Sequence, residues 1–400
     1  MKQPFRVAIV VTALVGILMS CLGHAEDGTR LKRQPDEFAI IFLMGYGGDS
    51  FPRDPARFEK LIVAAKEAHY NVVLCKYEDW RAEICKRHGM KIIVDLLTPA
   101  HHVYKSIEGA EQLCRSLRDS DDVYAYHLWS DRIGGTIAGR SRDVANVHRW
   151  DPGHPTYVGS YNGRSVGDLD DADIIGYYDF HWKRGGLWRH LHRMTEAARK
   201  NDASFLKYAD GAPGRVGAGN YNRVLYTISM SLAFGMKGYM YHHTGGEIDQ
   251  ATWKWTVHGD DLARVNAEIA PLGPLLMTLR NPAAVYSTPM TRTAKDRETG
   301  EDSPSIPAGL AGIPADSWFQ VKTGEAVVGV FQDDQKRDAL LFANHNAYQA
   351  QEMQVEFGAG VKAASRFDRR EGKWKPLQLN SRSVKFVIPP AAPELVLVAR

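Results

Sequence analysis

Short apolar runs alternate with amphipathic segments along the chain from residue 38 to about residue 280. The apolar runs end at glycine or polar residues, a pattern that predicts buried strands. In the segments between most runs, apolar residues recur every three or four positions, which predicts helices. The first helical segment reads "DPARFEKLIVAAKEAH", where Asp54 is a candidate N-cap and Pro55 takes the first helical position. The alternation therefore predicts strand–helix units and a parallel sheet.

Eight strands and six helices are predicted in this region. The strands cover residues 38–48, 71–77, 91–97, 123–131, 155–163, 171–182, 204–212 and 237–246, and the helices cover residues 54–69, 80–89, 106–120, 187–201, 220–235 and 261–279. Little helix is expected between the fifth and sixth strands. Eight units over roughly 240 residues match a (β/α)₈ TIM barrel, for which about 250 residues are typical. An open doubly wound sheet is the alternative, but the first strand lacks the glycine-rich nucleotide loop in the required form.

The pattern changes after Asn281-Pro282. A polar stretch rich in proline and glycine is followed by short strands at regular spacing, with turn residues between them and no evident helix. Runs such as "AVVGVFQDD", "DALLFANHN" and "ELVLVAR" are typical of a β-sandwich. We therefore expect a catalytic barrel over residues 36–280 and an all-β sandwich domain over residues 283–400.

The first residues have the layout of an export signal. Lys2 and Arg6 precede an apolar run, and small residues follow it, so residues 1–25 are predicted to be a signal peptide. Cleavage after Ala25 is favoured. The alternative is lipoprotein processing at Cys21, which would leave a lipid anchor at that residue. In both cases the protein is expected to be exported, to the periplasm or the extracellular space, and no other stretch is apolar enough to span a bilayer.

Charge and cysteine content exclude only a few classes of function. Removal of Lys2 and Arg6 with the leader lowers the formal charge from +3 to +1, and the remaining charges are interspersed. This gives no electrostatic footprint for nucleic acid or a membrane surface. Cys75, Cys85 and Cys114 remain, an odd number without metal-type spacing. A Cys75–Cys85 disulfide and buried free thiols are both compatible with this pattern.

Chemistry in a TIM barrel takes place at the C-terminal ends of the strands. In strand order, this chain places there Tyr46, Glu78, Asp95, Asp131, Tyr161, Asp179, Asp210 and His243. Cleavage of a glycosidic bond needs one carboxyl that protonates the leaving oxygen and another that attacks or activates water. Aromatic faces hold the sugar. The strand ends therefore predict a glycosidase.

The fourth strand, "VYAYHLWSD", carries His127, Trp129 and Asp131 at alternate positions, so we expect them on one face. Asp131 is the predicted proton donor, and desolvation by Trp129 would suit that role. The structural alternatives for Asp131 are a cap of the following glycine turn and an ion pair with Arg132.

The architecture resembles secreted retaining glycoside hydrolases of the large clan that includes β-galactosidases and cellulase-type barrels. In many of these sequences, strand four ends in an aromatic residue followed by Asp-Glu-Pro or Asn-Glu, and the Glu is the acid/base. Here "WSDR" stands at that place, so Asp131 takes the position of the Glu. The family's nucleophile is a Glu that ends strand seven, where "KYADGA" places Asp210. The run "SMSLAFGMKGYMYHH" also resembles the segment that leads into strand eight of such barrels.

Both positions carry Asp, which is one methylene shorter than Glu and widens the separation of the two carboxyls. Retention needs about 5–5.5 Å and inversion about 6.5–9.5 Å, so an inverting mechanism stays open. Asp179 competes with Asp210 as the second carboxylate, because the strand "YYDFHW" places Tyr177, Asp179 and His181 at alternate positions.

The remaining candidates are expected to bind the carbohydrate. They are Trp129, His127, Trp182, His181, Trp188, Tyr46, Glu78, Asp95 and His243. Glu247 follows "HHTGG" and is expected to be an exposed loop acid.

Two other functions compete with glycoside hydrolysis. A catalytically inactive carbohydrate-binding barrel would keep the aromatic residues. A metal-dependent hydrolase would need converging histidines and carboxylates, but the adjacent His242 and His243 face opposite sides of a strand. We therefore predict no metal site and no organic cofactor.

Overall fold

The computed structural model describes residues 33–43, 51–96, 107–129, 137–161, 172–178, 186–210, 221–242, 246–249, 251–290 and 306–400. The predicted signal peptide lies outside these residues. Within them, eight parallel strands close into a barrel in sequence order. These strands are β1 (Ala39–Phe42), β2 (Val72–Cys75), β3 (Lys91–Asp95), β4 (Val123–Trp129), β5 (Thr156–Tyr161), β6 (Ile174–Tyr178), β7 (Ser204–Asp210) and β8 (Gly238–His242). The predicted TIM barrel is confirmed.

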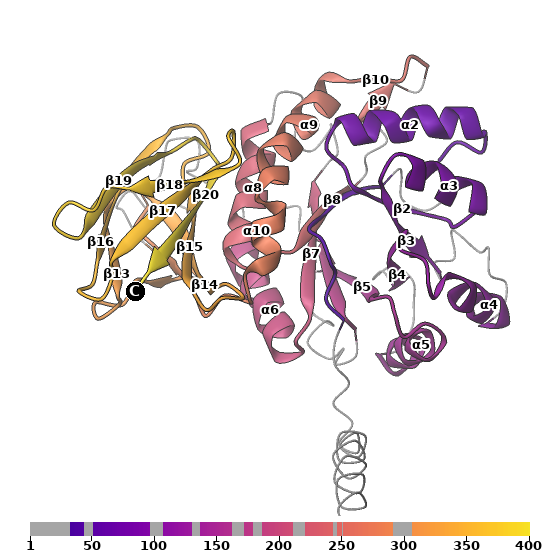
Figure 1. Cartoon of the computed structure of the whole chain (residues 1–400), viewed down its shortest axis with the longest axis horizontal. Helices are drawn as coiled ribbons and strands as arrows, with labels where there is room; N and C mark the ends of the chain where they lie inside the picture. Colours follow the sequence, from indigo (N-terminus) through magenta and orange to yellow (C-terminus); the bar gives the residue numbers. More distant parts are fainter. Residues whose placement is uncertain are drawn as a thin grey trace, which may run out of the picture. The chain divides into compact units, whose positions relative to one another are not determined.

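Helices lie around the barrel (Figure 1). They are α2 (Pro55–Glu67), α3 (Asp79–Arg87), α4 (Ile107–Leu117), α5 (Ile137–Trp150), α6 (Gly186–Lys200), α8 (Tyr221–Ala233), α9 (Val257–Ile269), the 3₁₀ turn η3 (Ala270–Leu272) and α10 (Gly273–Thr278). The predicted cap of α2 is present, because the Asp54 carboxylate accepts a hydrogen bond from the Arg57 amide at 2.9 Å. A two-stranded hairpin, β9 (Ile248–Asp249) and β10 (Lys254–Trp255), precedes α9.

The helix α5 was not predicted from the sequence. Its only regular apolar signal is Val144, Val147 and Trp150, which are spaced by three residues and are all buried. The other residues of the helix show no regular apolar spacing and include the weak helix formers Gly139, Ser141 and Asn146, so tertiary packing contributes much of its stability.

Two antiparallel sheets follow the barrel and correspond to the predicted β-sandwich. One has the order β12-β11-β14-β15-β20-β17-β18 and the other β13-β16-β19. Their bounds are β11 (Ala284–Ser287), β12 (Ala311–Gly312), β13 (Phe319–Thr323), β14 (Ala326–Gln332), β15 (Asp338–Asn344), β16 (Gln351–Phe357), β17 (Ala363–Asp368), β18 (Lys373–Leu377), β19 (Ser383–Ile388) and β20 (Pro393–Ala399). Only β11 and β12 pair in parallel. The strands β17 and β18 were missed because both are polar and largely solvent-accessible.

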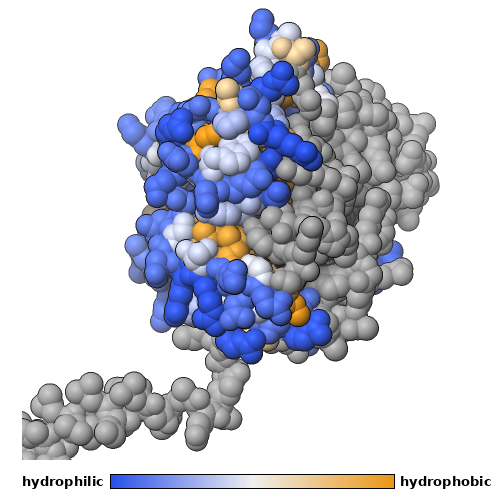
Figure 2. Space-filling model, turned by 90° about the vertical axis from the view of Figure 1, so that its right-hand side faces the viewer, coloured by the Kyte–Doolittle hydropathy of each residue, from blue (hydrophilic) through white to orange (hydrophobic). Residues whose placement is uncertain are grey.

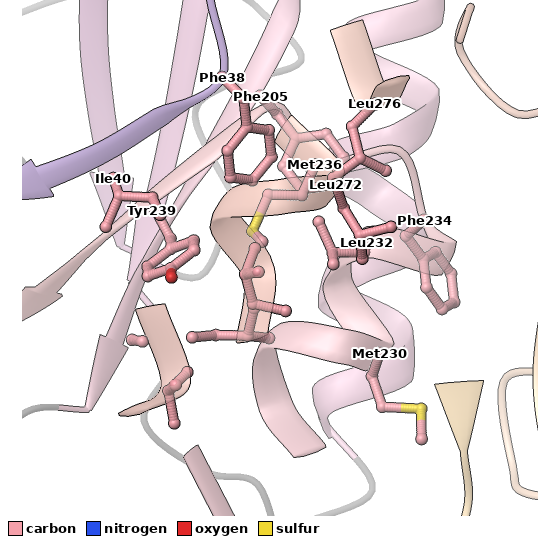
Figure 3. Close-up of a cluster of buried hydrophobic side chains, with 14 of the residues drawn as sticks. Phe38, Ile40, Phe205, Met230, Leu232, Phe234, Met236, Tyr239, Leu272 and Leu276 are labelled. Atoms are coloured by element: carbon pink, nitrogen blue, oxygen red, sulfur yellow. The ribbon is translucent and has the colours of Figure 1, made fainter. Parts of the chain in front are cut away.

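Helix α8 joins the barrel to the larger sheet, because it packs against β7 on one side and against β14, β15 and β20 on the other. Ten of its thirteen residues are buried. Gly329 of β14 permits this approach, since a Cβ at that position would lie 2.2 Å from the Ala233 carbonyl oxygen. A hydrophobic cluster continues from α8 to the strands β1, β7 and β8 and to α10 (Figure 3).

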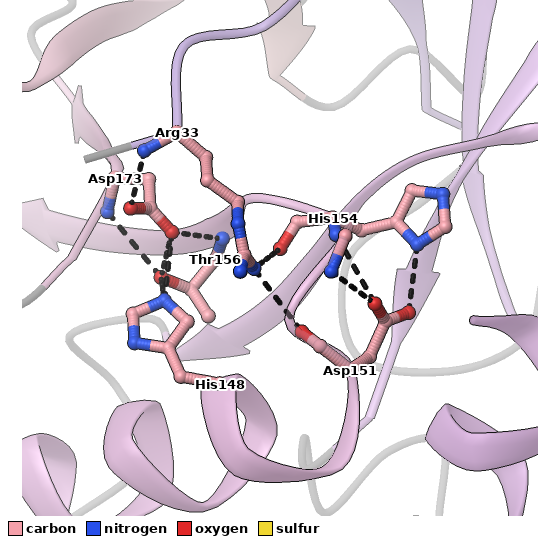
Figure 4. A network of polar contacts seen from close by, with 7 residues as sticks. Arg33, His148, Asp151, His154, Thr156 and Asp173 are labelled. Carbon is pink, nitrogen blue, oxygen red and sulfur yellow. Dashed lines mark hydrogen bonds and ion pairs between the residues drawn. The ribbon is translucent and has the colours of Figure 1, made fainter. Parts of the chain in front are cut away.

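A polar network lies at the N-terminal ends of β5 and β6 (Figure 4). The backbone amide of Arg33 donates to Asp173 Oδ1 at 3.0 Å, and its guanidinium donates to the carbonyl oxygens of Asp151 and His154. The second oxygen of Asp173 accepts from Thr156 and lies 2.7 Å from His148 Nε2. This network attaches Arg33 to the N-terminal face of the barrel. In a TIM barrel this face is opposite the strand ends that carry the chemistry.

The surface of the described residues offers no large apolar patch in the view of Figure 2, where hydrophobic residues form small separate spots. No helix of the described part is long and apolar enough to cross a membrane. Cys75, Cys85 and Cys114 are buried and are not joined by a disulfide, so the alternative of a Cys75–Cys85 disulfide is wrong. Burial raises the pKa of the Cys85 and Cys114 thiols to about 12.

Candidate active site

The interior of the barrel is a packed core of alternate strand residues. Its members include Ala39, Ile41, Leu43, Val72, Leu74, Ile93, Ala125, Tyr157, Ile174, Leu206, Tyr208 and Met240. Such layers support the strand ends and leave no pore. Polar groups enter this interior toward the C-terminal ends of the strands.

Asp95 and His127 form the principal polar pair. They occupy paired positions at the ends of β3 and β4, and His127 Nδ1 lies 3.1 Å from Asp95 Oδ1. Their side chains are only 2% and 6% exposed. A carboxylate that accepts from Nδ1 favours the tautomer in which Nε2 is an acceptor. Nε2 of His127 is buried and has no hydrogen-bond partner in the described part of the chain, so it is available to a donor from outside that part.

Two tyrosines extend this pair across the barrel. The His127 ring lies 5.0 Å from the ring of Tyr157 on β5, and Tyr157 stacks on Tyr208 of β7 at 6.3 Å. We call Asp95, His127, Tyr157 and Tyr208 the inner polar layer. Sequence analysis predicted the first two members but missed the tyrosines, although each stands at an inward alternate position before its strand end.

None of the three predicted catalytic residues has a described side chain. Asp131 and Asp179 are outside the described residues. Asp210 is the last residue of β7, and its backbone pairs with His242 of β8. Of the predicted binding residues, Tyr46, His181, Trp182 and His243 also lie outside the described part, and only the backbone of Trp129 is described.

The strand β4 does not follow the simple alternation predicted for it. His127 pairs with Tyr157, whereas Trp129 pairs with Val158, so β4 carries one extra residue at this point. Such an irregularity shifts the faces of the residues on its two sides. The expected common face of His127, Trp129 and Asp131 therefore cannot be derived from alternation, because nothing in the sequence marks the extra residue.

Tyr177 of β6 faces away from the inner polar layer. It belongs to the cluster between strands and helices, where its ring contacts Phe205 and its hydroxyl accepts from the Lys207 ammonium at 3.2 Å. Tyr177 was predicted to share a face with Asp179. The described strand ends at Tyr178, so Asp179 stays a prediction.

Glu78 lies at the N-cap position of α3 and takes part in ion pairs. Its carboxylate lies 3.0 Å from Lys76 Nζ and 3.2 Å from Arg81 Nε. Arg81 is fully buried and its guanidinium contacts the rings of Phe51, Phe58 and Trp80. These contacts hold Glu78 at the rim of the barrel beside the end of β2.

Trp188 lies at the start of α6 and is 8% exposed. Its ring stacks on Phe234 at 6.5 Å and meets His345 edge-on at 5.8 Å. His345 follows β15, and its Nε2 lies 2.8 Å from Ser287 Oγ. Trp188 therefore packs between the barrel and the following sheets, and its predicted contact with carbohydrate stays untested.

The expectation that Glu247 is an exposed loop acid is wrong. Glu247 is 1% exposed, and its Oε2 accepts a hydrogen bond from the Tyr70 hydroxyl at 2.9 Å. Burial raises the pKa of Glu247 well above its usual range. No signal in the neighbouring sequence marks this burial.

Within the described residues, no group of three or more His, Cys, Asp or Glu side chains has a geometry that would hold a metal ion. Of the histidine–carboxylate contacts, the Asp95–His127 pair is the one that lies at the C-terminal strand ends.

Solved structures with a similar fold include glycoside hydrolases. The chain is similar to a glycoside hydrolase with a TM-score of 0.55 and 13% identity, over 90% of this chain and 92% of that one. A glycoside hydrolase of family 5 from Bacteroides vulgatus has the same TM-score and identity, over 90% and 89% of the two chains. A maltogenic α-amylase from Thermotoga neapolitana has a TM-score of 0.51 and 9% identity, over 90% and 99%.

At such low identities the likeness shows the fold of barrel and C-terminal sheets alone. No family model matches the sequence. No curated protein matches it either.

Proposed function

We propose that this protein is a glycoside hydrolase that cleaves a poly- or oligosaccharide with two carboxylates at the C-terminal end of its barrel. The observation that carries the proposal is the inner polar layer, which lies directly beneath the strand ends that the sequence supplies with acids. A closed barrel brings the ends of β3, β4, β5 and β7 together at one face. Solved structures of similar architecture are glycoside hydrolases, which supports the same class of reaction.

In the proposed mechanism, Asp131 protonates the glycosidic oxygen as the bond to the leaving sugar breaks. Asp210 attacks the anomeric carbon or activates the water that does so. The strand β7 supports this role for Asp210, because position 210 lies two residues beyond the inward-facing Tyr208 and alternate residues of a strand share a face. Asp179 is the alternative second carboxylate, although alternation along β6 gives it the same face as Tyr177, which points away from the inner polar layer.

The Asp95–His127 pair has a binding role in this proposal. Asp95 orients the imidazole so that Nε2 can accept a hydrogen bond from a sugar hydroxyl. Trp129, Trp182, His181, Tyr46, Glu78 and His243 are proposed to complete the binding site, and Trp188 is retained as a weaker candidate. We propose that residues 1–25 direct export of the protein. The protein therefore meets its substrate outside the cytoplasm.

A reducing-sugar release assay over a broad polysaccharide panel tests this function. Wild type is compared with Asp131→Asn, Asp210→Asn and Asp179→Asn, each of which removes one charge with little change in volume. We expect one substrate to be cleaved, and loss of at least about a hundredfold in kcat for Asp131→Asn and Asp210→Asn. Loss in Asp179→Asn with an active Asp210→Asn would transfer the second role to Asp179. Equal activity of all four proteins would refute the paired-carboxylate mechanism.

A non-catalytic carbohydrate-binding barrel is the second candidate, because both positions that resemble family glutamates carry the shorter Asp. Binding of a polysaccharide by wild type and by all three Asn variants, with no release of reducing ends, would favour it.

A further inference from the structure

Glu247 is a buried carboxyl group with an incomplete set of hydrogen bonds. Tyr70 donates one hydrogen bond to Oε2, and Oε1 is buried with no partner in the described part of the chain. Burial of an ionised carboxylate with one hydrogen-bond donor and no positive charge costs far more free energy than burial of the neutral acid. The surroundings among the described residues therefore fit the neutral acid better than the anion.

The backbone around Glu247 is tied to the start of α9. The Thr256 amide donates to the Glu247 carbonyl oxygen at 2.8 Å, and the Thr256 hydroxyl donates to the Gly246 carbonyl oxygen at 2.6 Å. The same hydroxyl accepts from the Gly259 amide and caps the helix. A Cβ on Gly259 would lie 2.1 Å from the Glu247 carbonyl oxygen, so the helix approaches this segment as closely as glycine permits.

The surroundings of the carboxyl group are aromatic and uncharged. Tyr70 stacks on Trp255 of β10 at 6.4 Å and meets Tyr241 of β8 at 6.3 Å. Asn266 of α9 accepts hydrogen bonds from the hydroxyls of Tyr239 and Tyr241. Among the described residues, the titratable groups that act on Glu247, or on which it acts, are the hydroxyls of Tyr70 and Tyr241, and neither provides a positive charge.

We infer that Glu247 is a protonated anchor that pins the segment after β8 against the barrel wall, and that its ionisation releases residues 246–256 from this position. Glu247 lies five residues after His242, the last residue of β8. Glu247 is thus a positioning residue for the active-site mouth and makes no contact with substrate. This role rests on the proposed function.

The direction of the pH effect follows from burial. Burial raises the pKa of Glu247, and the hydrogen bond from Tyr70 opposes this rise. The stabilisation is complete below the unfolded pKa of Glu, about 4.3, and is lost as the pH rises toward the folded value. Alkaline rather than acidic conditions should open this segment.

Hydrogen exchange of the full-length protein measures this opening without any substrate. Peptides covering residues 246–256 are followed from pH 5 to pH 9, after correction for the intrinsic pH dependence of exchange. We expect wild type to exchange at least about tenfold faster at the alkaline end, because the open population rises up to tenfold per pH unit between the unfolded pKa of about 4.3 and the folded pKa, and levels off above it. Glu247→Gln keeps the shape and neutrality of the acid and should show no such increase. Peptides covering β16 are the internal control.

A second variant keeps the test decisive if Glu247→Gln folds poorly. Tyr70→Phe removes the hydroxyl that favours the ionised form of Glu247. The pH at which the exchange rate of residues 246–256 stops rising should therefore be higher in this variant. An identical transition in wild type and Tyr70→Phe, or an identical pH dependence in wild type and Glu247→Gln, would overturn the inference. Once a substrate is known, kcat/KM should fall along the same pH transition in wild type and not in Glu247→Gln. A shared alkaline decline in both would refute the positioning role while leaving the glycosidase proposal intact.

Discussion

The Nδ1 atom of His127 lies 3.1 Å from Oδ1 of Asp95, and both side chains are buried at the ends of adjacent strands. This bond selects one orientation and one tautomer of a histidine whose other ring nitrogen has no partner among the described residues. A buried histidine held in this way is rigid before any ligand arrives, and preorganisation of this kind reduces the entropy that binding loses.

The first prediction concerns the stability that this bond provides. Asp95→Leu leaves both ring nitrogens of His127 without a carboxylate partner, so we expect the free energy of unfolding to fall by about 1–3 kcal/mol. Asp95→Asn keeps an acceptor oxygen at the same place and should lose clearly less. Urea denaturation at neutral pH measures both. Equal losses in the two variants would show that the hydrogen bond to His127 contributes nothing.

The binding role of His127 is tested separately. His127→Phe keeps a ring against Tyr157 but removes the acceptor Nε2, so we expect KM to rise about tenfold, which corresponds to about 1.4 kcal/mol, with a smaller change in kcat. Steady-state kinetics on the substrate found in the sugar-release screen give both constants. A fall in kcat with unchanged KM would assign His127 to the chemical step instead.

Trp188 gives a prediction that separates packing from carbohydrate binding. Its ring is buried against Phe234 and His345, so truncation to alanine should lower the free energy of unfolding by about 3–5 kcal/mol. Trp188→Phe retains most of the contact and should lose less. If Trp188→Ala instead unfolds like wild type but binds substrate more weakly, the ring belongs to the binding site and its packing role is minor.

His345 should make the protein sensitive to acid. Burial lowers the pKa of its imidazole to about 3, far below the unfolded value of about 6.5. The stability of the neutral ring is present above the unfolded pKa and is lost as the pH falls toward the folded pKa. From pH 7 to pH 5 we expect wild type to lose about 2 kcal/mol more than His345→Gln in urea denaturation. Parallel pH dependences of the two proteins would contradict this assignment. The effect is opposite in sign to that of Glu247.

The network at the N-terminal face provides a control for all activity measurements. Asp151 accepts hydrogen bonds from the amides of Gly153 and His154, and it lies 2.7 Å from His154 Nδ1 (Figure 4). It also accepts a hydrogen bond from the Tyr126 hydroxyl. Burial alone would raise the pKa of Asp151, but the contacts with His154 and Tyr126 outweigh it and the pKa is lowered.

Loss of the Asp151 carboxylate should therefore lower stability and leave catalysis unchanged. We expect Asp151→Ala to lose about 3 kcal/mol or more, because several buried donors lose their acceptor. Its kcat/KM at a temperature where it stays folded should equal that of wild type, since this face of a TIM barrel is distant from the chemistry. A loss of kcat/KM in the fully folded variant would show that the two faces are coupled.

The sequence by itself determined the architecture. Strands and helices of the barrel show in the local spacing of apolar residues, and the change to short strands after residue 283 marks the second set of sheets. It also placed Asp95 at the end of the third strand, because the end of an apolar run is a local signal, and His127 within the fourth strand. It missed α5, β17 and β18, where few apolar residues carry the pattern.

The tertiary structure decided the environment of each side chain. Glu247 lies in a segment that reads as an exposed loop, yet it is buried because Tyr70, 177 positions earlier, donates to it. Trp188 is covered by Phe234, which follows α8, and by His345, which follows β15. The extra residue in β4 shows only in its pairing with β5. Local periodicity reports which face of an element is apolar, whereas burial and hydrogen bonding depend on which distant elements pack against that face.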